Sequence, residues 1–315
     1  MLINRGNLTN KGLEVSLNGV VANTETFRLD IGGNIAFNQS TITSLGIPDS
    51  EILLDGRLQN KSFYLGDNIS TGTYFKSPAN IFIKGEEVGL FYGYETDGIY
   101  QEGDAIEVAD TQVGDIKIID QLTEDTNNDG VADASDGVIN AKDRTIIGNP
   151  NPDYIYGLTV DMTYKRFNLN VLMNGVAGNE IANGNLLRIT SPEGNAGNIL
   201  ASAYHNAWRE DRPSNSYPRI GYTKEQNAIA ITDRIIEDGS YFRISNITLG
   251  YDVPVSGAVS KLNVYMSGMN LWTFTGYSGY NPEVTNFLSN GNIIGVDWNG
   301  FPNTRTFLFG VNVNF

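Results

Sequence analysis

The sequence contains no cysteine and a single histidine, His205. Disulfides, thiolate metal sites and multi-histidine metal sites are therefore excluded, and a histidine-dependent catalytic triad would have to be built around one residue. Acidic residues are plentiful enough for a glycosidase carboxylate pair, whose separation in space is not readable from sequence. Because no other catalytic motif is present, we do not expect an enzyme.

Basic residues are scarce. Lysine and arginine number 21 against 36 aspartates and glutamates, which gives a formal net charge of −15. Because binding to a phosphate backbone needs clustered cations, we do not expect nucleic acid as a partner.

Long hydrophobic runs are missing as well. No uncharged apolar run approaches the roughly 18 residues that a membrane-spanning helix needs. A transmembrane β-strand needs only about 9–11 residues, of which every second one is apolar, so the composition is compatible with a β-barrel. The residues after Met1 do not form a signal peptide. Since an outer-membrane protein needs one, a barrel would imply that Met1 lies inside a longer protein.

Seven segments alternate apolar and polar residues with the period of two that is typical of a strand with two different faces. They lie near residues 13–21, 27–38, 154–164, 167–175, 241–252, 261–272 and 304–315. We therefore predict an all-β fold of about seven antiparallel strands. In a barrel the apolar faces would meet lipid, and the polar faces would line the lumen. The predicted lumen-facing residues include Asp161, Asn168, Asn170, Asn246 and Thr248.

The lengths of the connections alternate between short and long. Residues 22–26, 165–166 and 253–260 form short turns, whereas residues 39–153, 176–240 and 273–303 form long connections. Outer-membrane barrels have short turns on the periplasmic side and long loops outside. A soluble β-sandwich would also show alternating strands. The length pattern favours the barrel, and a secreted, calcium-stabilised sandwich that binds glycans is the alternative.

Several segments resemble the SusC/RagA family of TonB-dependent outer-membrane transporters, in the order in which that family has them. They are Asn10-Lys11-Gly12-Leu13-Glu14, Phe91-Tyr92-Gly93-Tyr94, Asp97-Gly98-Ile99-Tyr100, Asp143-Arg144-Thr145-Ile146-Ile147-Gly148-Asn149-Pro150, Tyr241-Phe242-Arg243-Ile244 and Asn281-Pro282-Glu283. The resemblance covers the whole chain. It implies that residues 1–315 are a single partial domain, the C-terminal part of a 22-stranded, plugged transmembrane barrel with long extracellular loops.

The resemblance also implies a function. Members of the family import oligosaccharides or peptides across the bacterial outer membrane, driven by the TonB complex and assisted by a surface lipoprotein of the SusD type. The plug domain, the TonB box and the earlier strands are absent from this chain. A siderophore receptor of the same fold is a second alternative, which the motifs disfavour.

One segment has the form of a calcium-binding loop. Asp125-Thr126-Asn127-Asn128-Asp129-Gly130 follows the D-x-[DN]-x-[DN]-G pattern, in which alternate oxygen atoms converge on the ion and glycine permits a tight turn. The predicted Ca²⁺ ligands are Asp125, Asn127, Asp129, the carbonyl group of Val131, Asp133 and Asp136. The alternative is a surface turn rich in aspartate and asparagine that holds no metal.

Two further groups of residues have candidate roles. Phe315, an aromatic residue at the end of an alternating strand, resembles the signal that the outer-membrane assembly machinery reads, and it is also a suitable membrane-interface residue. Aromatic residues in or beside the long connections could stack on sugars or contact a lipoprotein partner, or they could close the loops over a small core. They are Trp208, Tyr217, Trp272, Tyr277, Tyr280 and Trp298.

Overall fold

The computed structural model describes residues 6–54, 56–68, 77–106, 108, 111–190, 198–220, 231–284 and 290–315. Its main feature is a seven-stranded antiparallel sheet in which each strand pairs with the next one along the sheet in chain order. The strands are β1 (Asn7–Asn23), β2 (Phe27–Ser44), β11 (Tyr154–Tyr164), β12 (Phe167–Ala177), β15 (Tyr241–Val253), β16 (Lys261–Thr275) and β18 (Thr306–Asn314). The prediction of seven antiparallel strands is confirmed.

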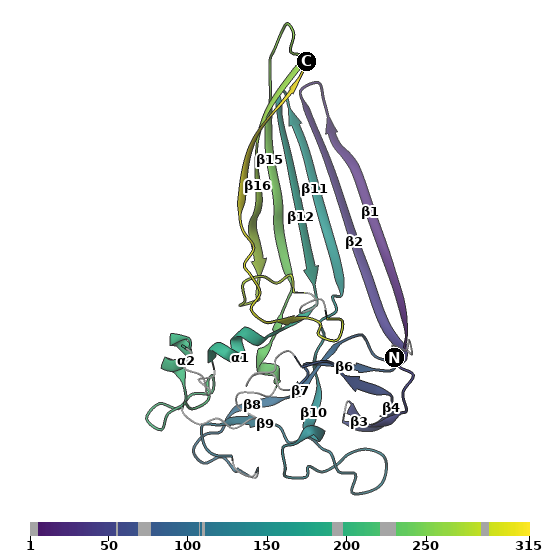
Figure 1. The fold of residues 1–315 in the computed structure, drawn as a ribbon, viewed down its shortest axis with the longest axis vertical. Coiled ribbons are helices and arrows are strands. Elements are labelled where there is room, and N and C mark those ends of the chain that lie inside the picture. Colours follow the sequence, from purple (N-terminus) through teal and green to yellow (C-terminus); the bar gives the residue numbers. More distant parts are fainter. Residues whose placement is uncertain are drawn as a thin grey trace.

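The sheet is tall, and its two ends differ. Three short turns and the C-terminus lie at one end, and the long connections gather at the other (Figure 1). β1 and β2 are 17 and 18 residues long, longer than the sequence alternation indicates, because their ends near the long connections are mostly polar yet remain paired.

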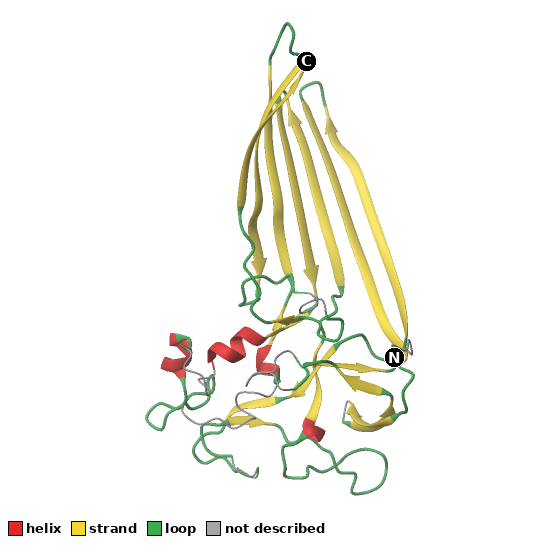
Figure 2. Ribbon diagram, in the orientation of Figure 1, coloured by secondary structure: helices red, strands yellow, loops and turns green. Residues whose placement is uncertain are grey.

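The long connections are not simple loops, because they carry their own strands and helices (Figure 2). The connection between β2 and β11 holds β3 (Ser50–Leu54), β4 (Arg57–Lys61), β5 (Phe63–Leu65), β6 (Asn80–Ile83), β7 (Leu90–Tyr94), β8 (Thr96–Ile99), β9 (Ile116–Ile118), the 3-10 helix η1 (Ala141–Asp143) and β10 (Arg144–Gly148). The next one holds β13 (Glu180–Asn183), α1 (Gly184–Thr190), α2 (Ala201–Asn206), the 3-10 helix η2 (Asp233–Ile235) and β14 (Ile236–Asp238), and the last holds β17 (Val296–Asp297). We call these three connections together the cap.

The cap has the hydrophobic core of the molecule. Its largest cluster joins residues from all three connections: Ala79, Phe91, Ala182, Leu187, Ile231, Ile235, Ile293 and Val296. Buried polar groups strengthen the junction. The Asn80 side chain donates to the carbonyl oxygen of Ile294 at 3.0 Å and accepts from the Ile294 N–H at 3.0 Å. The three connections therefore pack as one unit.

The seven-stranded sheet, by contrast, leaves its apolar side chains exposed. Leu17 is 75% exposed and Phe309 is 74% exposed. An apolar surface of this extent is typical of an interaction site rather than of a water-facing surface. Among the described residues, the helices are all too short or too polar to traverse a bilayer.

Candidate functional site: the polar face of the sheet and its cap

The polar side chains of the sheet share one face because neighbouring strands are in register. Asp161 on β11 lies opposite Asp30 on β2 and opposite Asn170 on β12, and Asn170 lies opposite Thr248 on β15. Since side chains alternate with a period of two, matched registers place these residues on the same side.

Hydrogen bonds link these side chains from strand to strand. Asn170 Nδ2 donates to Asp161 Oδ1 at 2.7 Å. Thr248 Oγ1 lies 2.8 Å from Ser267 Oγ and 2.9 Å from Asn246 Oδ1. Amide and hydroxyl groups thus satisfy one another across the face.

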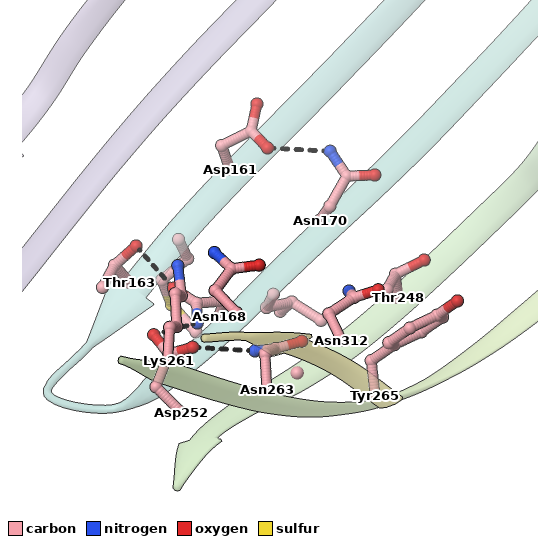
Figure 3. A pocket seen from close by; sticks show the side chains of 14 residues that line it. Asp161, Thr163, Asn168, Asn170, Thr248, Asp252, Lys261, Asn263, Tyr265 and Asn312 are labelled. Atoms are coloured by element: carbon pink, nitrogen blue, oxygen red, sulfur yellow. Dashed lines mark hydrogen bonds between the residues drawn. The ribbon is translucent and has the colours of Figure 1, made fainter. Parts of the chain in front are cut away.

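The polar face is hollowed at the end that carries the short turns. The hollow has a volume of about 560 Å³, and Asp161, Asn168, Asn170 and Thr248 line it (Figure 3). Asn246 does not line the hollow, but it accepts a hydrogen bond from Thr248 on the same face. The structure therefore brings the five predicted lumen residues to one concave polar face. Their exposure to a lumen stays a prediction.

Two carboxylates on this face, those of Asp30 and Asp252, have a cation nearby. The guanidinium group of Arg28 contacts both carboxylate oxygens of Asp30, at 2.7 and 2.8 Å. Asp252 accepts hydrogen bonds from Asn168 Nδ2 at 3.2 Å and from Asn263 Nδ2 at 2.9 Å, and Lys261 is close enough to attract it electrostatically.

The opposite face carries aromatic rings at two levels. Near the cap, ring contacts at 5.7 to 6.4 Å connect Phe37, Tyr154, Tyr156, Phe242 and Phe274 in a row across the sheet. Near the short turns, Phe167 and Tyr251 pack at 4.9 Å. Two aromatic levels with aliphatic residues between them are typical of a lipid-facing barrel wall with interfacial belts.

A buried arginine joins the sheet to the last connection. Arg243 on β15 is 4% exposed, donates to Thr273 Oγ1 and to Asn281 Oδ1 at 2.9 Å each, and forms an ion pair with Glu283. Burial is the largest single influence and opposes the charged form of Glu283, but the hydrogen bonds from Arg243, Asn303 and Tyr241 and the charge of Arg243 together outweigh it, so the pKa of Glu283 is lowered. We did not predict this cluster, although both of its segments are among those that resemble the family.

The predicted loop aromatics mostly pack within the cap. Tyr277 is 5% exposed and donates its hydroxyl to Asp297 Oδ2 at 2.6 Å, and burial together with Asp297 raises the pKa of Tyr277. Trp208 and Trp298 pack against two of the cap clusters, and the backbone of Tyr217 accepts a hydrogen bond from Trp208. Tyr280 is 74% exposed. Contact with a ligand stays a prediction for each of them, and Tyr280 is the most accessible.

Trp272 and Phe315 belong to the sheet. Trp272 lies within β16 and is 50% exposed. Phe315 directly follows β18, is 88% exposed and lies at the short-turn end (Figure 1). Its role as an assembly signal stays a prediction.

The predicted calcium loop is closed by hydrogen bonds of its own. The Asp125 carboxylate accepts the N–H groups of Asp129 at 3.2 Å and Gly130 at 2.8 Å, and Asp129 Oδ1 accepts the N–H of Val131 at 2.8 Å. Asp133 accepts from the N–H and hydroxyl of Thr126, which lower the pKa of Asp133. Within the described residues, no three acidic or histidine side chains converge as a metal site would require. Calcium binding stays a prediction.

No protein-family model matches the chain. The chain is 33% identical over 322 residues to TonB-dependent receptor P3 of Formosa agariphila and 27% identical over 321 residues to TonB-dependent receptor SusC of Bacteroides thetaiotaomicron. The matches include 99% and 100% of this chain, but only 29% and 27% of those receptors. The RagAB peptide transporter has a similar fold, with a TM-score of 0.70 at 20% identity over 99% of this chain and 30% of that one.

Proposed function

Because the chain belongs to the SusC/RagA family of TonB-dependent outer-membrane proteins, we propose that it is part of an importer that takes up oligosaccharides or peptides. The seven-stranded sheet is then one stretch of the barrel wall, with its polar face toward the lumen and its apolar face toward lipid. The separation of the two faces supports this proposal most strongly. Asp161 lines the polar hollow, whereas Val160, the residue before it on the same strand, is apolar and does not line it.

The cap has a separate role in the proposal. It lies at the end of the sheet where barrels of this kind carry their extracellular loops, and its internal core gives it a defined shape. Such a surface suits the recognition of a substrate and the docking of a SusD-like lipoprotein. Contact with the TonB complex would be made by parts of the receptor outside this chain.

The alternative of a secreted β-sandwich requires two sheets that cover each other's apolar faces. In the described residues, the seven long strands form one sheet, and its apolar face is exposed. This arrangement favours the barrel. The names of the relatives, receptors and a transporter, also fit a protein that is not an enzyme.

Deletion of the gene in the native host tests the proposal. Uptake of oligosaccharides, peptides and a ferric siderophore would be measured in wild-type and deletion cells, with and without a protonophore. We expect the deletion and the protonophore to abolish the same component of oligosaccharide or peptide uptake. Loss of siderophore uptake alone would replace the proposal with the siderophore alternative, and unchanged uptake of all three would contradict an import function.

A further inference from the structure

The acidic excess of the chain is concentrated in one connection. Residues 45–153 contain 21 of the 36 acidic residues and only seven of the 21 basic residues. Elsewhere, acidic and basic residues nearly balance. The first connection of the cap therefore carries almost the entire net charge of −15.

Many of these carboxylates are open to solvent. The described exposed acidic residues of the first connection are Asp49, Glu51, Asp67, Asp97, Glu102, Asp104, Glu124, Asp129, Asp133 and Asp153. Cations of the same connection are partly neutralised, because Lys61 pairs with Glu86 and Lys117 pairs with Asp97, each at 2.6 Å. Arg144 is buried and donates to backbone carbonyl oxygens. The cap thus presents a negative surface to an approaching solute.

The polar face of the sheet gives an independent second observation. Its described cations are Arg28, Arg243 and Lys261, and each of them has a carboxylate beside it. Asp161 adds a further negative charge, bound only to the amide of Asn170. In the part of the wall that the structure describes, no row of unmatched cations is available to a chain of anionic groups.

Pores that conduct anions carry rings of arginine or lysine, whereas acidic rings favour cations. A negative field at the mouth of a channel also slows the approach of anions and speeds that of cations. On these grounds, and resting on the proposed function, we propose that the imported solute is a neutral or positively charged oligomer. Sulfated, phosphorylated and uronate-rich chains would then be poor substrates.

This assignment can be tested without knowing the substrate, by separating a mixed digest according to charge. A digest of polysaccharide and protein from the medium of the host would be passed over an anion-exchange column at neutral pH. The unbound and bound fractions would then be offered to wild-type and deletion cells. We expect receptor-dependent uptake from the unbound fraction to exceed that from the bound fraction by at least about tenfold.

Predominant receptor-dependent uptake from the bound, anionic fraction would overturn the assignment while leaving the import function intact. No receptor-dependent uptake from either fraction would instead contradict the import function itself. The two failures are therefore distinguishable.

A matched pair of variants tests whether the polar face contributes. Asp161→Lys replaces a negative charge on that face with a positive one, and we expect it to raise the ratio of anionic to neutral uptake severalfold. Glu25→Lys makes the same change in the short turn between β1 and β2 and should leave the ratio unchanged. If the two variants have equal ratios of anionic to neutral uptake at matched surface levels of the receptor, the polar face does not contribute to the discrimination against anions.

Discussion

Arg243 and Glu283 form an ion pair that joins β15 to the last connection of the cap. The Tyr241 hydroxyl donates to Glu283 Oε1 at 3.2 Å, and Asn303 Nδ2 donates to Glu283 Oε2 at 3.2 Å. The Glu283 carboxylate thus contacts β15 through Arg243 and Tyr241. Through Asn303 it also contacts a second segment of the last connection. Together with the hydrogen bond from Arg243 to Asn281, that carboxylate ties the last connection to the sheet.

We expect Glu283→Gln to loosen the last connection. The substitution leaves the nearly buried guanidinium group of Arg243 without its counter-charge, and the loss of charged hydrogen bonds should cost about 1.5–3 kcal/mol of local stability. Cleavage of the connection by an added protease on intact cells measures the effect. Asp211→Asn, which alters an exposed carboxylate of the second connection, is the control. Equal cleavage of both variants and the wild type would contradict this role.

The same pair predicts a pH dependence. The pKa of Glu283 is lowered in the folded state, so its contribution is fully present above the unfolded value of about 4.5. It should be lost as the pH falls through the lowered folded pKa. The protection of the amides of the last connection against hydrogen exchange, relative to their intrinsic exchange rates at each pH, should therefore fall in acid below about pH 4.5. The Glu283→Gln variant should lack this pH-dependent change. A change of equal size in the variant would show that other titratable groups cause it.

Calcium should bind to the folded receptor through the loop 125–136. Binding would require its carboxylates to exchange their backbone hydrogen bonds for the ion, and position twelve offers Asp136 in place of the usual bidentate glutamate, so weak affinity is expected. Titration calorimetry gives the measurement, and Asp129→Asn is expected to reduce the heat. If no heat is measured at millimolar calcium, the segment is an aspartate-rich surface turn that holds no metal.

Deletion of Phe315 should lower the amount of receptor that reaches the cell surface. The exposed ring lies at the end of the sheet that carries the short turns, where an assembly factor or the membrane interface can contact it. Surface labelling of cells measures the effect. Phe315→Tyr, which keeps an aromatic ring, should behave like the wild type, and normal assembly of the deletion would contradict a signal role.

The sequence was informative wherever one strand was long enough for its pattern to repeat. The 11 residues of β11 contain several full periods, so the strand could be placed together with its two faces. The three residues of β9 contain hardly more than one period, and the cap was therefore predicted as loops. Contacts such as Asn80 with Ile294, or Arg243 with Glu283, join residues far apart in sequence and depend on packing that no local pattern encodes.

If the sheet is part of a barrel wall, one of its faces meets lipid and the other meets water. Because the chain has no cysteine, single cysteines can be introduced at each position from 157 to 163 and spin-labelled in the receptor within a bilayer. We expect labels at 158, 160 and 162 to collide with oxygen dissolved in lipid, and labels at 157, 159, 161 and 163 to collide with a water-soluble nickel complex. Equal water accessibility at all seven positions would contradict the barrel wall.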